Sequence, residues 1–294
     1  MNNIYEELFS QYNCAALNDR QIRQEVEQLL HAHLSANLNT EVYKFCLGCV
    51  DLTSLNSTDN DAQIVKMVQK VNRMSKIFPE APLPAGICVY PNFISTVKKT
   101  LQVDVNTVAV SGGFPASQTF AEIKTAETAM AVMEGADEID VVMPVGNFLS
   151  GKYEKVREEL EEMKASCRKA PLKVIIESGV LPSASEIKKA SVLAMSSGAD
   201  FIKTSTGKTA VSATPEATYV MCQAVKAWHT KTREKVGIKV AGGIVTAEDA
   251  VAHYTIVKQI LGTGWLDKKY FRIGASRLAN NLLNEIAGKE TRYF

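Results

Sequence analysis

The segment 199–208 reads Ala199-Asp200-Phe201-Ile202-Lys203-Thr204-Ser205-Thr206-Gly207-Lys208 and is the most informative part of the chain. Its apolar start after Gly198 is typical of a buried parallel strand. A lysine inside such a strand is costly, because a desolvated ammonium is strongly disfavoured. The usual relief is loss of the proton, which leaves an amine that attacks carbonyl carbons. The alternative is an edge-strand lysine whose ammonium reaches solvent.

The same kind of segment recurs along the chain as a short apolar strand, a polar loop and a helix. Four helix starts show capping chemistry, with Thr58 before Asp61, Ser183 before Glu186, Thr214 before Pro215 and Thr246 before Asp249. The expected strands begin near Phe45, Gly86, Thr107, Glu138, Lys173, Phe201, Ile238 and Phe271.

Eight parallel strands that alternate with helices predict an α/β protein with a single (β/α)8 TIM barrel. We assign residues 41–288 to the barrel, 1–40 to an N-terminal helical extension and 289–294 to a mobile C-terminal tail. Within the extension, residues 21–34 have helical periodicity. A doubly wound open sheet is the alternative fold, but it would normally carry a glycine-rich nucleotide turn after its first strand. The segment after Val50 has no glycine there.

Composition and charge exclude several classes of function. The 294 residues include 33 basic and 32 acidic residues, so no excess charge marks a nucleic-acid or membrane surface. No apolar run reaches the length of a membrane span, and the N-terminus lacks the pattern of a signal peptide. Six cysteines in a chain this long do not indicate a disulfide framework. We therefore expect a cytoplasmic protein with reduced thiols.

Polar residues sit where the predicted strands end, which is where barrels carry their chemistry. One ammonium can lower the pKa of a neighbouring ammonium, so two lysines on adjacent strands favour one neutral amine. A carboxylate opposite them can relay protons. The candidates are Asp51 and Thr53 on the first strand, Cys88 on the second, Asp140 on the fourth, Lys203 on the sixth and Lys239 on the seventh.

A second group of residues predicts an anion site. Backbone N–H groups in the loops after the last strands of barrels commonly hold phosphate. Glycine pairs are weak evidence alone, since tight turns also need them. Their position in the last units of this chain favours a phosphate site made of Thr206, Gly207, Lys208, Gly242, Gly243, Gly274 and Ser276.

Three other patterns do not lead to a function. Gly207-Lys208-Thr209 resembles the end of a P-loop, but Ile202 stands where that motif requires glycine. Cys46 and Cys49 form a C-x-x-C pattern inside the predicted first strand, where they would point to opposite faces as buried core thiols. The four histidines fall on predicted helices, which argues against a zinc site.

Several segments together resemble the deoxyribose-phosphate aldolase family, in order across roughly residues 44–285. They are Asp51-Leu52-Thr53-Ser54-Leu55, Ile87-Cys88-Val89-Tyr90-Pro91, residues 136–142, Lys173-Val174-Ile175-Ile176-Glu177, residues 201–208 and residues 239–243. The resemblance implies a class I aldolase without metal or cofactor that converts 2-deoxy-D-ribose 5-phosphate to acetaldehyde and D-glyceraldehyde 3-phosphate. Its only implied partner is this phosphorylated sugar, and a homo-oligomer stays open.

The resemblance also implies individual roles. Lys203 matches the Schiff-base lysine, Lys239 the second lysine and Asp140 the carboxylate of the proton relay. Asp51 matches a residue that contacts substrate hydroxyls, and Cys88 matches a thiol of the active site. Another Schiff-base sugar-phosphate aldolase and a non-catalytic scaffold on the same fold are the alternatives.

The sequence departs from the family pattern at three places. Val245 follows Gly243-Ile244 where the family often has arginine, which predicts weaker phosphate binding. Ser117 stands where we expect glycine after the third strand. The family's terminal tyrosine is represented by Tyr293, one residue from the end, so we expect Tyr293 to be a candidate lid residue on the mobile tail.

Overall fold

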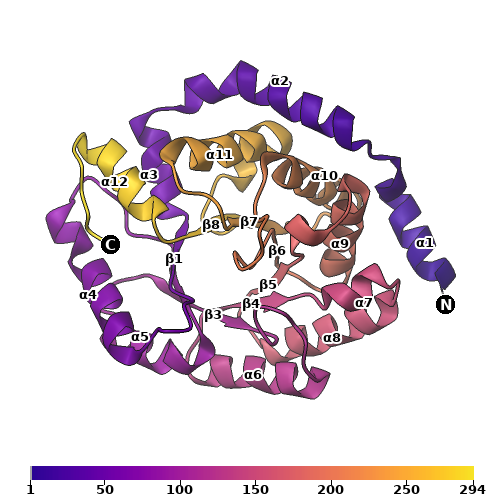
Figure 1. Ribbon diagram of the computed structural model, residues 1–294, viewed down its shortest axis with the longest axis horizontal. Helices are drawn as coiled ribbons and strands as arrows, with labels where there is room; N and C mark the ends of the chain where they lie inside the picture. The colour runs from indigo at the N-terminus through magenta and orange to yellow at the C-terminus, as the bar shows by residue number, and fades with distance from the viewer. Residues whose placement is uncertain (1) are drawn as a thin grey trace.

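A closed barrel of parallel strands forms the centre of the computed structural model, which describes residues 2–294 (Figure 1). Each strand pairs with the next along the chain, and the last pairs with the first. The prediction of a (β/α)8 barrel is therefore confirmed, and the open sheet is excluded. The strands are β1 (Val50–Thr53), β2 (Gly86–Val89), β3 (Asn106–Ser111), β4 (Glu138–Val142), β5 (Leu172–Ile175), β6 (Phe201–Lys203), β7 (Gly237–Ala241) and β8 (Phe271–Ala275).

Helices surround the barrel as a continuous outer layer (Figure 1). None of the helices within residues 2–294 is long and apolar enough to cross a membrane. Their bounds are α1 (Asn2–Gln11), α2 (Asp19–Asn37), α3 (Thr40–Gly48), α4 (Asp61–Ile77), α5 (Ile94–Thr100), α6 (Ala121–Met133), α7 (Val145–Leu149), α8 (Tyr153–Ser166), α9 (Ala184–Ser196), α10 (Pro215–Thr232), α11 (Ala247–Leu261) and α12 (Leu278–Ala287). Short 3₁₀ turns are η1 (Cys14–Ala16), η2 (Pro91–Phe93), η3 (Ser178–Val180) and η4 (Thr263–Trp265).

Three of the four predicted helix caps are confirmed. Ser183, Thr214 and Thr246 are the N-caps of α9, α10 and α11, and each accepts a backbone N–H through its side chain. The prediction for Thr58 is wrong, because Asn60 caps α4 in a reciprocal capping box with Gln63. Asparagine caps as well as threonine does, and here it stands directly before the first helical residue.

The expected start of the first strand near Phe45 is also wrong. Residues 40–48 form α3, capped by Asn39, and β1 begins only at Val50. Val42 and Cys46 are buried four residues apart, which is a helical spacing. Cys46 and Cys49 are buried core thiols as predicted, but in a helical turn rather than on opposite faces of a strand. Burial raises the pKa of both thiols.

The N-terminal segment packs on the outside of the helical layer. The predicted helix at 21–34 is part of α2, which lies along α10 and α11 (Figure 1). The Tyr219 hydroxyl donates to Glu25 at 2.9 Å, and the Asn37 side-chain amide donates to the Thr255 hydroxyl at 3.0 Å. These contacts join the extension to the last third of the barrel. The assignment of residues 1–40 as a separate extension stays a prediction.

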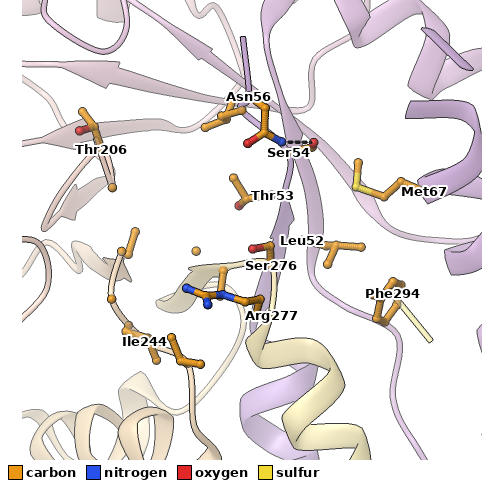
Figure 2. Close-up of a pocket in the computed structure, with 18 of the residues that line it drawn as sticks. Leu52, Thr53, Ser54, Asn56, Met67, Thr206, Ile244, Ser276, Arg277 and Phe294 are labelled. Carbon is orange, nitrogen blue, oxygen red and sulfur yellow. Dashed lines mark hydrogen bonds between the residues drawn. The ribbon is translucent and has the colours of Figure 1, made fainter. Parts of the chain in front are cut away.

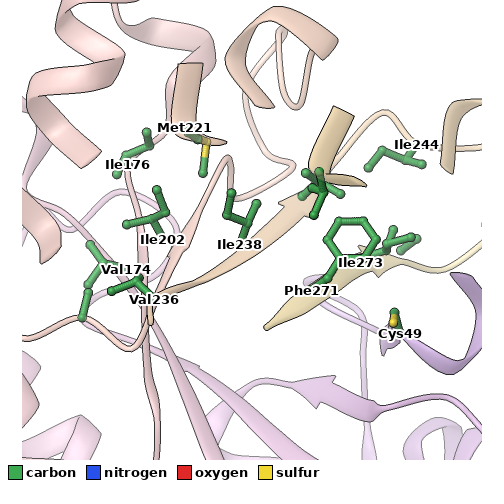
Figure 3. Packing of buried hydrophobic residues seen from close by; sticks show 14 of the residues in the cluster. Cys49, Val174, Ile176, Ile202, Met221, Val236, Ile238, Ile244, Phe271 and Ile273 are labelled. Atoms are coloured by element: carbon green, nitrogen blue, oxygen red, sulfur yellow. The ribbon is translucent and has the colours of Figure 1, made fainter. Parts of the chain in front are cut away.

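Successive side chains of each strand point alternately to the apolar layer between strands and helices and to the barrel lumen. Ile202 and Ile238 are paired in register, fully buried, and belong to the apolar cluster with Met221 of α10 between strands and helices (Figure 3). Full burial of each such side chain contributes about 1.5–3 kcal/mol. Because successive side chains of a strand point to opposite faces, Lys203 and Lys239 point into the barrel.

Candidate active site

Two lysines meet one carboxylate in the barrel lumen. Lys203 on β6 is paired in register with Lys239 on β7. Their side chains are 3% and 0% exposed, and Asp140 on β4 is also 0% exposed. The Asp140 Oδ2 atom accepts a hydrogen bond from each Nζ at 2.7 Å. The structure therefore brings together the three residues that the sequence predicted for catalysis.

Lys239 has a second carboxylate. Its Nζ donates to Asp51 Oδ2 at 2.5 Å, so it lies between two aspartates while Lys203 contacts only one. Space for this pair comes from glycines on the neighbouring strands. A Cβ on Gly86 would lie 2.7 Å from Asp51 Oδ1, and a Cβ on Gly274 would lie 3.2 Å from Lys239 Cε.

The charged contacts continue into a closed ring. Arg272 on β8 donates to Asp51 at 2.6 Å and to Glu138 on β4 at 2.5 Å. Lys173 on β5 is 2.6 Å from Glu138 and donates to Asp140 Oδ1 at 2.8 Å. We call this closed set the lumen ring; its members are Asp51, Glu138, Asp140, Lys173, Lys239 and Arg272.

The sequence prediction missed half of this ring. Glu138 is two residues before Asp140 on the same strand, so alternation alone puts both side chains on the lumen face. Lys173 and Arg272 stand on neighbouring strands in register with Asp140 and Lys239, respectively. Alternation along β4 was the signal for Glu138, and correct strand registers would have identified Lys173 and Arg272.

The pKa values of Lys203 and Lys239 shift in opposite directions. Burial lowers the pKa of Lys203, and the ammonium of Lys239 lowers it further against the opposing effect of Asp140. Burial alone would also lower the pKa of Lys239, but Asp140 and Asp51 outweigh it and raise that pKa. Burial acts to raise the pKa of Asp140, but Lys173, Lys203 and Lys239 outweigh it and hold that pKa well below its usual value.

The number of buried charges in the lumen also favours a neutral Lys203. The lumen ring contains the three carboxylates of Asp51, Glu138 and Asp140, and three cations. Lys203 would be a fourth buried cation without a carboxylate of its own, since its partner Asp140 also binds two members of the ring. An uncompensated buried charge is expensive, so a neutral Lys203 amine balances the lumen.

A cavity of about 590 Å³ opens over Lys203 at the C-terminal ends of the strands. Figure 2 shows Thr53, Thr206, Ser276 and Arg277 around it. Asp51, Asp140 and Lys239 lie deeper, in the lumen. The predicted site residues that line the cavity are Thr53, Lys203, Thr206, Gly207, Lys208, Gly242, Gly243, Gly274 and Ser276. Residues that the sequence did not predict here include Asn56, Lys66, Lys70, Arg277 and Phe294.

Glycines shape the wall after β6 and β7. Gly207, Gly242 and Gly243 have φ values of 75°, 82° and 80°, which only glycine adopts at no steric cost. A Cβ on Gly242 would lie 2.9 Å from Gly207 Cα, so the two loops touch through their backbones. A Cβ on Gly243 would meet nothing within 4 Å. Successive exposed N–H groups in such turns form a concavity suited to an anion.

Glu177 fixes the loop that follows Lys203. This side chain is 4% exposed and was not predicted as a site residue. It accepts hydrogen bonds from the Thr206 backbone at 3.1 Å and from the Thr206 hydroxyl at 2.5 Å. On the other side of the cavity mouth, the Lys208 ammonium donates to the Leu55 carbonyl at 2.5 Å. The position of the Gly207 turn therefore depends on contacts from two other loops.

Cys88 and Val245 lie at the margins of the site. Cys88 is buried on β2, and burial raises the pKa of its thiol. Val245 lines the cavity, and its backbone N–H donates to Asp249 at 3.0 Å. Ser117, where the sequence departs from the expected glycine, has a φ of 55°. The serine therefore adopts the left-handed conformation that explains the usual glycine.

The C-terminal tail reaches the cavity through its last residue. Phe294 lines the cavity, whereas the Tyr293 hydroxyl donates to the Lys70 carbonyl at 2.5 Å and its ring packs against Phe78. Asn280 binds the backbone N–H groups of both tail residues at 2.9 Å. Tyr293 is not among the cavity-lining residues of 2–294, so this arrangement does not place its phenol at the reacting centre.

No group of three or more His, Cys, Asp or Glu side chains in the described part of the chain is arranged as a metal site. The acidic residues of the lumen are engaged by lysine and arginine instead. The geometry therefore offers amine and carboxylate chemistry at Lys203, with an anion site at the cavity wall.

Known proteins are similar to this chain in sequence and in fold. The family model for DeoC/LacD family aldolases matches residues 32–264. A Caenorhabditis elegans protein named "Putative deoxyribose-phosphate aldolase" is 39% identical over 249 residues, which are 83% of this chain and 82% of that protein. The crystal structure of a Toxoplasma gondii protein of the same name is similar with a TM-score of 0.75 and 22% identity, over 86% of this chain and 96% of that chain. A deoxyribose phosphate aldolase from Aeropyrum pernix, described as a unique tetrameric structure, is similar with a TM-score of 0.65 and 22% identity, over 91% and 98% of the two chains.

Proposed function

The chain belongs to the DeoC/LacD family of aldolases, and from this premise we propose that it cleaves 2-deoxy-D-ribose 5-phosphate reversibly through a Schiff base on Lys203. The products are acetaldehyde and D-glyceraldehyde 3-phosphate. The observation that carries the proposal is the buried Lys203. Among the described side chains its one carboxylate partner is Asp140, which already binds two other lysines.

The first step is attack of the Lys203 amine on the aldehyde carbon C1 of the open-chain sugar. The carbinolamine that forms loses water to give an iminium. The departing hydroxyl takes its proton from a general acid. Lys239 suits that acid role, because its ammonium is hydrogen-bonded to Asp140 and through it to Lys203. Asp140 can therefore pass a proton between the two lysines.

The second step breaks the bond between C2 and C3. The iminium nitrogen takes up the electron pair of that bond, which leaves an enamine on C1 and C2. The C3 hydroxyl gives its proton to a base, and C3 becomes the aldehyde carbon of glyceraldehyde 3-phosphate. Protonation of the enamine at C2 and hydrolysis of the resulting iminium release acetaldehyde and the free Lys203 amine. Asp140, Lys239 and a water would move these protons.

The cavity wall supplies the anchor for the far end of the substrate. The backbone of Gly207, Gly242, Gly243 and Gly274, together with Ser276, would hold the phosphate. Arg277 also lines the cavity, although the segment after Gly243 carries Val245 in place of arginine. Binding energy from this remote group orients C1 toward Lys203 and the reacting bond over the lumen. Thr53 and Asp51 would contact substrate hydroxyls, and Cys88 would form part of the apolar floor.

The test is release of acetaldehyde from 2-deoxyribose 5-phosphate with a chelator present. We expect full activity with the chelator, because the mechanism uses no metal or cofactor. Profiling of other phosphorylated aldehydes and ketones separates this substrate from that of another Schiff-base sugar-phosphate aldolase. Complete lack of turnover with every aldol substrate would instead support a non-catalytic scaffold.

We also infer a homo-oligomer in the cytoplasm. The Aeropyrum pernix relative is described as tetrameric, and α6 exposes a row of large apolar side chains. Ile123, Met130 and Met133 of α6 and its N-cap residue Phe120 are each more than half exposed. Sedimentation of the purified chain should give a mass above 32.1 kDa, and a monomer would contradict the inference.

A further inference from the structure

The lumen ring contains an arm that does not touch Lys203. Lys173 joins Asp140 to Glu138, with Nζ–O distances of 2.8 and 2.6 Å. Glu138 continues the arm to Arg272 at 2.5 Å and also accepts the Asn106 side-chain amide at 2.5 Å. All three charged side chains are almost fully buried, so water screens them little.

The arm acts on Asp140 at one defined atom. In the part of the chain that the structure describes, Oδ1 of Asp140 accepts from Lys173 alone, whereas Oδ2 accepts from Lys203 and Lys239. The Lys173 ammonium neutralises part of the Asp140 charge at Oδ1. Asp140 then stabilises an ammonium on Lys203 less strongly through Oδ2. Glu138 opposes this effect, because it competes with Asp140 for the same Lys173 ammonium.

We propose that Lys173 and Glu138 are positioning residues that together keep the Lys203 amine uncharged, by setting the charge balance around Asp140. The inference rests on the proposed role of Lys203 and deepens it. Removing the Lys173 charge leaves three carboxylates for Lys239, Arg272 and Lys203, so a protonated Lys203 then balances the lumen. Removing the Glu138 charge leaves one carboxylate fewer in the lumen and therefore favours the neutral Lys203 amine further. Removing the charges of both Lys173 and Glu138 restores the wild-type charge balance.

Other charged groups around Lys203 are unchanged in these variants. Asp51, Lys239 and Arg272 come from β1, β7 and β8, and the Cys88 thiol comes from β2. Above the lumen, the Glu177 carboxylate is bound to Thr206, and the Lys208 ammonium is bound to the Leu55 carbonyl. The contacts of Glu177 and Lys208 do not involve Lys173 or Glu138. Arg272 is bound to Glu138 and belongs to the arm, and in Glu138→Gln it keeps its contact with Asp51.

The experiment measures how fast acetaldehyde and cyanoborohydride label Lys203 as a function of pH, from about pH 5 to about pH 9. Intact mass gives the rate and peptide mass gives the labelled residue. Only the neutral amine attacks, so the rate rises with pH through the pKa of Lys203. In Lys173→Met we expect this rise to move to higher pH by about one to three units. In Glu138→Gln we expect it to move to lower pH, and in the double variant to return to the wild-type position.

A matched control is the buried pair Lys124–Glu159, which joins α6 to α8 at 2.7 Å outside the lumen. Lys124→Met removes an equally buried lysine and should leave the pH profile in place. Thermal unfolding reports whether each variant is folded, and the isosteric Glu138→Gln tests the sign even if Lys173→Met does not fold. Shifts of both single variants in the same direction, or no shift in either, would overturn the inference. Absence of label on wild-type Lys203 would overturn the proposed function instead.

Discussion

Strands β6 and β7 present the same residue type to the same carboxylate, with opposite consequences for its pKa. Lys203 and Lys239 are equally buried, paired in register and 2.7 Å from Asp140 Oδ2. The pKa of Lys203 is lowered by burial, whereas that of Lys239 is raised because Asp51 adds a second carboxylate. In the proposed mechanism, the number of carboxylate partners, rather than burial, decides which lysine acts as the nucleophile and which acts as the acid.

The largest effect on this comparison should come from removing the carboxylate that the two lysines share. Asp140→Asn keeps the shape but loses the charge that joins Lys203 to Lys239. We expect turnover to fall by roughly 10²- to 10⁴-fold, the range for a lost acid–base group. Steady-state kinetics with Asp137→Asn as control, a carboxylate paired with Lys98 outside the lumen, would test this. Turnover within a few-fold of wild type would mean that Asp140 is structural.

Removing the second carboxylate should reduce the difference between the lysines. In Asp51→Asn, Lys239 keeps only Asp140, as Lys203 does in the wild type. The pKa of Lys239 should then fall, by about one to three units for a lost close charge partner. We expect borohydride trapping with acetaldehyde to label Lys239 alongside Lys203, which peptide mass would detect. Label confined to Lys203 at every pH would show that Asp51 does not separate the two lysines.

Substitutions at the glycines of the cavity wall should weaken binding of the phosphorylated sugar rather than slow the cleavage step. Gly243→Ala forces a side chain into a φ of 80° and into the open space where the phosphate would bind. Loss of one to two charged hydrogen bonds should raise KM for the phosphorylated sugar by roughly ten- to a hundredfold. KM for 2-deoxyribose itself should change little. Gly262→Ala has a similar φ of 81° away from the cavity and controls for backbone strain. An equal loss with both sugars would contradict a phosphate role.

The smallest effect is expected at Tyr293. Tyr293→Phe removes a hydrogen bond to the Lys70 carbonyl and should cost about 1 kcal/mol of stability, with turnover within a few-fold of wild type. Deletion of residues 290–294 also removes Phe294 from the cavity wall and should slow turnover more. Thermal unfolding and kinetics on both variants separate these roles. Slow turnover at unchanged stability in Tyr293→Phe would support the phenol as part of a lid.

The barrel and the central residues could be predicted because strong local physics marks them. A lysine in the apolar segment before Thr204 is costly in any fold, and repeated strand–helix units specify the barrel. Phe45 was assigned to a strand because a short apolar run does not distinguish a strand from a buried helix. The roles of Lys173 and Arg272 depend on strand register, which a single sequence does not give. Alternation along β4 does place Glu138 beside Asp140, but its ion pairs with Lys173 and Arg272 depend on that register. The Glu177 contact to Thr206 depends on how two loops pack and has no local signal.

The most direct test of the account is the position of the covalent intermediate in the wild-type protein. Acetaldehyde and borohydride should convert the iminium to a stable ethyl amine, which peptide mass then locates. We predict a single adduct on Lys203, with Lys239 and Lys173 unlabelled at neutral pH because their carboxylate partners keep them protonated. An adduct on Lys239, or no adduct at all, would contradict it.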